Sequence, residues 1–239
     1  MTTSLWLAID PESQAELGTL VGASDGGANW ARLNGPHEVL GYPERRLPPG
    51  GTVRDYLAAR REGARDFTLW RTPERGEPFT HVETVSTAKG GASDYEVRAA
   101  DGTPLATIRR QAGSLLRFRR ARWTVTRLGP TDRPAVVGSK GGIASWCAWW
   151  AFSPVQAVLV VITYPFALFG GSFEGVARPR RTRWRGVDGG PVALDYRGAK
   201  RSLEILADGW DPRVTAALVV LFDSWMTTKP RESSEPSFV

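Results

Sequence analysis

The segment VTAALVVLF, from 214 to 222, restricts the possible folds of this chain most strongly, because every residue in it except Thr215 is apolar. Asp211 and Pro212 come before it, which is a typical helix start with Asp as the N-cap and Pro at the first helical position. A helix that is apolar on all sides must be surrounded by protein. Its length of roughly 14 Å is far below the ~30 Å of a bilayer core. The sequence therefore predicts a helix over 211–226 that fills a protein core.

The residues before this helix favour β-hairpins. In YEVRAADGTPLATIRR, which begins at Tyr95, apolar and polar residues alternate as in a half-buried strand, and Asp101-Gly102 provides a turn. Residues 183–198 repeat the plan around a turn at 188–190, and a third hairpin is indicated at 120–138. The residues expected to alternate with the core-facing ones are Arg122 and Thr124 in one strand and Ala193, Asp195 and Arg197 in another. Successive hairpins suggest a meander that closes into a sandwich or a barrel.

This order of hairpins, an arginine-rich strand and a terminal apolar helix resembles the tubby C-terminal-like superfamily, which includes phospholipid scramblases and LURP-one-related proteins. The segments that carry the resemblance are YEVRAADGTPLATIRR, RFRRARWTV, DGGPVALDYR and LEILADGWDPRVTAALVVLFDSW. The resemblance implies a mainly β fold, a closed antiparallel β-barrel around a buried hydrophobic C-terminal helix, and work on lipids or at a membrane surface.

The resemblance also sets the domain organisation. It covers roughly residues 79–227, with an insertion at 141–173. Residues 1–78 are expected to supply early strands or a cap, and within them Thr52, followed three residues later by Asp55, is close to a capping box and indicates a helix start. The tail 228–239 is expected to be disordered.

Basic residues are concentrated in two blocks. Residues 105–140 carry nine basic and one acidic side chain, and residues 174–201 carry eight and three. Solvated strand faces explain such blocks. Attraction to anionic lipid explains them as well, since each Lys or Arg at such a surface contributes about 1 kcal/mol. The side chains predicted to bind lipid headgroups are Arg117, Arg119, Arg120 and Arg122 in one strand region and Arg178, Arg180, Arg181, Arg183 and Arg185 in the chain that follows the insertion.

The run between these blocks, 141–173, contains no charged residue. It is longer than the roughly 20 apolar residues that one membrane crossing needs and shorter than the roughly 40 needed for two. Both flanks are basic, which favours the cytoplasmic side for both, and the hairpins around the run belong to one barrel. The run is therefore predicted to form a helical hairpin, broken near Pro154 or Pro165, that dips part-way into a membrane. Packing against the barrel or between copies, and a single crossing, are the alternatives.

The side chains predicted to insert into the membrane are Trp146, Trp149, Trp150, Phe152, Val158, Leu159, Phe166 and Phe169. The tryptophans among them resemble an interfacial aromatic belt.

No motif in the chain predicts catalysis. His37 and His81 are far apart, and the single cysteine, Cys147, excludes an intrachain disulfide and a cysteine-rich zinc site. The sequence contains no nucleophile elbow, phosphate-binding loop or dinucleotide-binding glycine pattern. We therefore expect no catalytic residue, no metal and no cofactor, and favour a non-enzymatic protein over a hydrolase or transferase with an unrecognised site.

Two partners fit the net charge of +6. Arginines interleaved with aromatic residues, as in RFRRARW and RTRWR, suit nucleic acid, whereas a barrel wall with aromatic side chains inside and arginines outside shows the same pattern and is favoured. The chain is accordingly predicted to be a lipid-binding protein at the cytoplasmic face of the cell membrane, peripheral or monotopic. Without the membrane dip it would be a cytoplasmic barrel that uses the run to form a homo-oligomer. The start of the sequence shows no secretory signal.

Overall fold

The computed structural model describes residues 3–8, 20–25, 38–46, 51–72, 74–88, 91–113, 120–128, 135–140, 181–198 and 202–226. The strands are β1 (Thr3–Ala8), β2 (Leu20–Asp25), β3 (Glu38–Arg45), β4 (Phe67–Trp70), β5 (Pro78–Thr87), β6 (Ala92–Ala99), β7 (Pro104–Gln111), β8 (Arg122–Arg127), β9 (Val136–Lys140), β10 (Arg181–Gly186), β11 (Val192–Arg197) and β12 (Ser202–Ile205). The helices are α1 (Val53–Glu62) and α3 (Pro212–Met226). The insertion 141–173 and the tail 228–239 lie outside the described residues.

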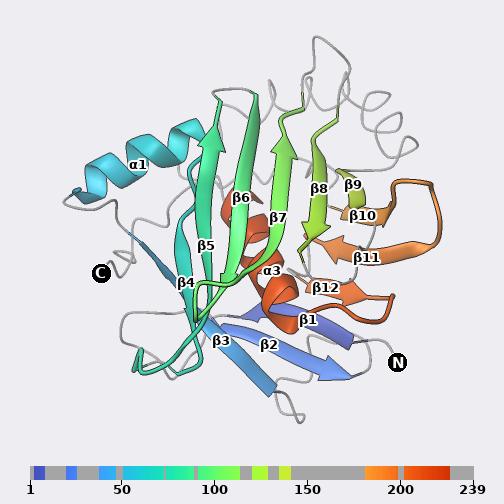
Figure 1. The fold of residues 1–239 in the computed structure, drawn as a ribbon, viewed down its shortest axis with the longest axis horizontal. Coiled ribbons are helices and arrows are strands. Elements are labelled where there is room, and N and C mark those ends of the chain that lie inside the picture. The colour runs from blue at the N-terminus through green and yellow to red at the C-terminus, as the bar shows by residue number, and fades with distance from the viewer. Residues whose placement is uncertain are drawn as a thin grey trace, which may run out of the picture.

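The strands form an antiparallel meander. Each strand from β1 to β12 pairs with its neighbours in sequence, so that strands from the first 78 residues join the same sheet as the later ones. β1 also pairs with β12, from Thr3 opposite Ile205 to Trp6 opposite Ser202, and the order of pairing returns to β1. Figure 1 shows the strands arranged around α3. The prediction of a mainly β antiparallel fold with a C-terminal helix against the sheet is confirmed.

The three predicted hairpins are present as β6–β7, β8–β9 and β10–β11. In β6 every second side chain is buried, at Ser93, Tyr95, Val97 and Ala99, which is the alternation that a strand with one face on a core requires. The turn between β6 and β7 contains Gly102 at a φ of 84°, a conformation that costs glycine little because it has no Cβ.

Asp195 departs from the expected alternation in β11. It lies on the outward row but is only 3% exposed. The covering groups are arginines of the neighbouring strand: the Nε of Arg181 lies 2.9 Å from Asp195 Oδ1, and the Nε of Arg183 lies 3.6 Å from Oδ2. These charge-assisted contacts replace the water that a buried carboxylate loses. A carboxylate can therefore be buried on the outer face of this sheet.

α1 begins where the capping box predicts. The backbone N–H of Thr52 donates to Asp55 Oδ2 at 2.8 Å, and the Thr52 hydroxyl accepts from the Asp55 N–H. Gly63 ends the helix in the left-handed conformation, with a φ of 117°. The helix lies outside the strands in Figure 1 and buries Tyr56.

α3 is a core helix, as predicted. Asp211 caps it, since its Oδ1 accepts from the backbone N–H of Arg213 at 2.8 Å. The single hydroxyl in the apolar segment, on Thr215, donates to the Pro212 carbonyl at 3.1 Å and so needs no water. Phe222 is 1% exposed and is the centre of an aromatic cluster contributed by three different strands. Its ring centroid lies 4.2 Å from that of Trp123, 4.9 Å from that of Trp184 and 5.0 Å from that of Tyr196.

A glycine makes room for this cluster. Gly138 of β9 stands in register between Trp123 and Trp184. A Cβ at Gly138 would lie 2.7 Å from Nε1 of Trp184, well inside van der Waals contact. The absence of a side chain at Gly138 therefore lets the indole of Trp184 lie flat against the sheet beside α3.

We call one end of the strand meander the upper end, because β5 and β7 end at the top of Figure 1. β5, β7, β9 and β11 end there, and β6, β8, β10 and β12 begin there, because consecutive antiparallel strands alternate in direction. α3 ends there as well, since Trp225 Nε1 donates to the hydroxyl of Tyr95 at 3.1 Å. The connection from β9 to β10, which contains the uncharged run, leaves and returns at this end, with Lys140 opposite Thr182.

Candidate functional site

Arginines of β8 and β10 share one outward row near the upper end. Arg122 is opposite Ser139 of β9, and Ser139 is opposite Arg183. Because neighbouring strands are about 4.8 Å apart, the two arginines are separated by only about 10 Å along the row. Arg122, Arg183 and Arg185 are exposed, whereas Trp184 is fully buried. The prediction that the arginines face solvent while the tryptophan faces the core is confirmed.

The arginines of this row differ in their partners. Arg181 forms an ion pair with the buried carboxylate of Asp195, which raises the pKa of Arg181 through the hydrogen bond. Arg197 also forms an ion pair, with its Nη2 donating to Glu204 Oε2 at 2.9 Å. Arg183 is further from Asp195, at 3.6 Å, and the Nη1 of Arg185 donates to the carbonyl of Gly190 at 3.0 Å. Arg183 and Arg185 are therefore better placed than Arg181 to meet an external anion.

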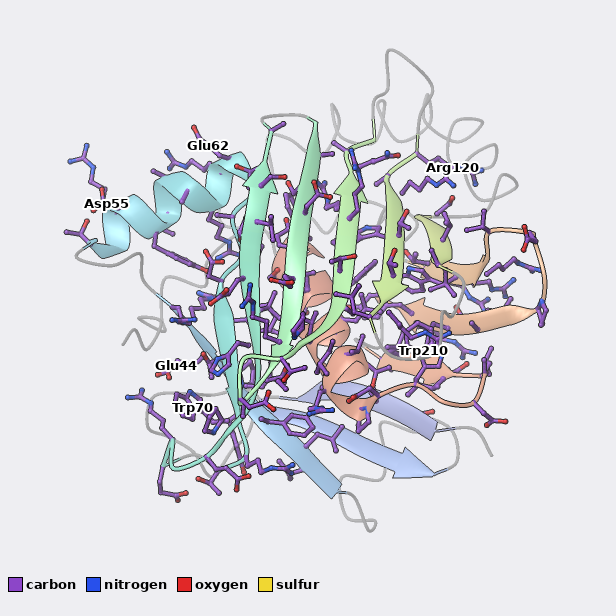
Figure 2. The ribbon with its side chains drawn as sticks, viewed as in Figure 1. Glu44, Asp55, Glu62, Trp70, Arg120 and Trp210 are labelled. Atoms are coloured by element: carbon purple, nitrogen blue, oxygen red, sulfur yellow. The ribbon has the colours of Figure 1, made fainter. Side chains whose placement is uncertain are left out.

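Arg120 precedes β8 at the same end. Figure 2 shows it near the upper end of the strands, far from Trp210, which lies before α3. The structure thus places Arg120, Arg122, Arg181 and Arg183 of the predicted headgroup-binding residues toward the upper end, whereas Arg185 lies at the other end of β10, beside the turn to β11. The other predicted site residues lie outside the described part of the chain: Arg117, Arg119, Arg178, Arg180, Trp146, Trp149, Trp150, Phe152, Val158, Leu159, Phe166 and Phe169.

A second group of arginines lies on the inward side of the upper end, and the sequence did not predict it. The guanidinium carbons of Arg65 and Arg110 lie 4.2 Å and 3.5 Å from the ring centroid of Trp225, which is the cation–π arrangement. The hydroxyl of Tyr95 accepts from Trp225 and donates to the carbonyl of Gly63 at 2.7 Å. These hydrogen bonds fix the indole and so fix the position of both cations.

This inward cluster carries positive charge with little compensation. Arg65 is 6% exposed, and burial together with the nearby charges of Arg60 and Arg110 lowers its pKa to about 10. Burial also lowers the pKa of Arg110. Among the described residues, neither Arg65 nor Arg110 forms an ion pair with a carboxylate. Perturbed pKa values of this kind concentrate at functional sites as well as in structural networks.

The sequence contained one signal for this cluster. Ala106 and Ile108 face the core in β7, and period-two alternation places Arg110 on that same inward side. An arginine at a core-facing position requires an explanation, because it is rarely buried without a partner. The remaining members, Arg65 and Trp225, are separated from it by long stretches of chain, and only the fold brings them together.

Histidine chemistry is limited to one contact in the described part of the chain. His81 Nδ1 lies 3.0 Å from the hydroxyl oxygen of Thr68, and burial, followed by the charge of Arg46, lowers the pKa of His81. His37 and Cys147 lie outside the described residues. Within those residues, no three His, Cys, Asp or Glu side chains gather in a way that could hold a metal ion. No helix in the same residues has both the length and the apolarity needed to cross a membrane.

The fold and the two arginine groups define a mainly β protein whose upper end is cationic on both its outer and its inner side. Comparison with protein-family models, with curated proteins and with solved structures gives no match for this chain.

Proposed function

We propose that this chain is a non-enzymatic, membrane-associated lipid-binding protein of the scramblase or tubby-like type, with a closed barrel around α3, that acts at the cytoplasmic face of the cell membrane. One observation carries the proposal. The uncharged run 141–173 leaves from β9 and returns to β10, which are adjacent antiparallel strands, and exposed arginines flank it at that end. A single crossing would place the two strands on opposite sides of the bilayer and separate them.

The physical reasoning joins two attractions. An apolar hairpin that enters from one side contributes a term that salt does not weaken. Arginines at headgroup depth contribute about 1 kcal/mol each toward an anionic leaflet, and salt screens this term. Arg120, Arg122 and Arg183 together would supply about 3 kcal/mol, which corresponds to roughly a hundredfold in affinity.

Co-sedimentation with vesicles tests the proposal. Wild-type protein is expected to bind anionic vesicles more tightly than neutral ones, and less tightly at high salt than at low salt. Replacing Arg120, Arg122 and Arg183 with Gln should weaken binding to anionic vesicles by roughly a hundredfold and flatten its dependence on salt. Removal of residues 145–171 should abolish binding to neutral vesicles.

A matched control removes equal charge elsewhere. Arg46, Arg71 and Arg98 are 49%, 51% and 41% exposed and lie on or beside β3, β4 and β6. Their triple replacement with Gln should change vesicle binding far less. Equal losses for the two triple variants would show that only net charge matters. Soluble wild-type protein that sediments with neither vesicle type would defeat the proposal, and a stable oligomer in that case would assign the run to self-association.

The buried aromatic residues argue against nucleic acid as the partner. Trp123 and Trp184 are 3% and 0% exposed and cannot stack on bases without unfolding. Binding of single-stranded DNA that is as tight as vesicle binding, and equally sensitive to the Arg120, Arg122 and Arg183 replacements, would favour the nucleic-acid alternative.

A further inference from the structure

We infer that Arg65, Arg110 and Trp225 form an anion-binding site for a phosphate-bearing ligand on the inward side of the upper end. This site is separate from the outer row of Arg122 and Arg183, because Arg110 lies on the opposite face of the sheet from its neighbour Arg109. The inference does not rest on the proposed function, since the phosphate could belong to a soluble molecule as well as to a lipid headgroup.

Carbonyl groups at two helix C-termini accept some of the hydrogen bonds that these arginines donate. Arg60 Nη2 donates to the carbonyl of Ser224, close to the C-terminus of α3, at 3.2 Å. Arg65 Nη1 donates to the carbonyls of Arg60 and Ala64 at the C-terminus of α1, at 2.7 Å and 2.6 Å. Helix C-termini carry partial negative charge and favour cations, so these contacts help to hold the arginines in place.

The helix C-termini do not supply hydrogen-bond acceptors for all N–H groups of these arginines. The Nε of Arg65 is buried, and no hydrogen-bond acceptor for it lies among the described residues. The guanidinium of Arg110 has the face of Trp225 at 3.5 Å and that of Trp123 at 5.8 Å, but an aromatic face does not accept directed N–H bonds as an oxygen does. Buried N–H groups of a charged side chain require an oxygen acceptor. An anion bound between the two arginines would supply one.

Charge and access indicate a phosphate. Two guanidinium groups that both contact the ring of Trp225 match a group with about two negative charges and several acceptor oxygens, and arginine binds such groups through two parallel hydrogen bonds. Burial, followed by the charge of Arg45, lowers the pKa of Arg60, and the carboxylate of Asp223 opposes this only in part. Arg110 and Trp225 are partly exposed, whereas Arg65 is buried, so a ligand that arrives from solvent would meet Arg110 first.

Inorganic phosphate is the first probe. Thermal melting of the full chain at constant ionic strength, with phosphate replacing chloride, should show a rise in Tm that saturates with phosphate concentration, because a ligand that binds only the folded state stabilises it. Isothermal titration supplies the affinity. Arg110→Gln should weaken the phosphate affinity at least tenfold. Arg109→Gln is the matched control: it removes the same charge one residue away, from a side chain that is 57% exposed and lies 3.7 Å from Asp94, and should leave the affinity unchanged.

Arg110→Lys covers the case in which Arg110→Gln does not fold. It keeps the charge but loses the paired donors, so a several-fold weaker affinity is expected. The inference is overturned if wild-type protein binds phosphate no more tightly than chloride, or if the Arg110 variants and Arg109→Gln bind it equally well.

Binding of the same variants to vesicles shows whether the phosphate belongs to a lipid headgroup or to a soluble molecule. The vesicles carry a phosphate monoester headgroup, as in phosphatidic acid. If Arg110→Gln loses both phosphate and vesicle binding, the site takes a lipid headgroup. If it loses phosphate alone, the site takes a soluble ligand. If wild-type protein binds phosphate but no vesicle, the site stands while the proposed membrane function fails.

Discussion

Gly138 provides a direct test of how the core is packed. In Gly138→Ala the new Cβ would lie 2.7 Å from Nε1 and Cε2 of Trp184, and 2.8 Å from Cδ1. The indole cannot move away freely, because Trp184 is fully buried and its ring packs edge-on against Phe222 at 4.9 Å between centroids. The substitution should therefore force a shift of the tryptophan or of α3.

The expected magnitude follows from two opposing effects. Alanine in place of glycine in a strand gains about 0.5–1 kcal/mol, since the unfolded chain loses freedom. Overpacking a buried site costs about 1–3 kcal/mol. The net loss should be up to about 2.5 kcal/mol, with a middle value of about 1.3 kcal/mol that lowers the Tm of a chain of this size by about 3–5 °C. Gly186→Ala is the control, because a Cβ there meets no atom within 4 Å, and its stability should equal or exceed that of the wild type.

Heat and urea unfolding followed by circular dichroism measure both variants. A double variant, Gly138→Ala with Trp184→Leu, separates the clash from other effects, because the smaller leucine leaves room for the Cβ. Its loss of stability should be smaller than the sum of the two single losses by about 0.5–3 kcal/mol. If Gly138→Ala is as stable as Gly186→Ala, or if the two losses are additive, the reasoning about Trp184 is wrong.

Two further predictions concern buried groups. Leu218→Asp should prevent folding, since Leu218 is 1% exposed and an unpaired buried charge costs about 4 kcal/mol or more. The control Leu206→Asp, at a residue that is 47% exposed, should fold. Soluble expression and circular dichroism distinguish the two variants, and a Leu218→Asp variant that melts normally would contradict the assignment of α3 to the core. Burial and Arg46 lower the pKa of His81 below its ordinary value of 6.5, so the unfolded state binds the proton more readily, and the free energy of unfolding should fall as pH drops through 6.5. Urea unfolding at pH 7.5 and pH 5 should show a smaller fall for His81→Gln, and an unchanged fall would remove His81 as its cause.

Local signals in the sequence predicted most of the elements around the core. Alternation placed Tyr95 and Val97 inside, and the pair Asp101-Gly102 marked the turn that follows them. Asp211 marked the start of α3. Each of these signals lies within one strand, one turn or one cap, where neighbouring residues decide the structure.

The features that the sequence did not predict depend on contacts between distant residues. Asp195 was expected on a solvated face, but Arg181 of the neighbouring strand covers it. Arg65, Arg110 and Trp225 come from three separate elements, and no spacing rule relates them. Their meeting point depends on where the end of α3 lies against the strands, which has no local sequence signature.

The place of α3 in the chain order has a consequence for synthesis on the ribosome. All of the strands among the described residues emerge before α3. The inward side chains Tyr95, Ile108, Trp123 and Trp184 therefore cannot pack against this helix until it has been synthesised. β1, the first of these strands, must also wait for β12 before its second edge is paired. The nascent chain thus carries an apolar sheet surface and an open edge until β12 and α3 have left the exit tunnel, and such surfaces favour aggregation.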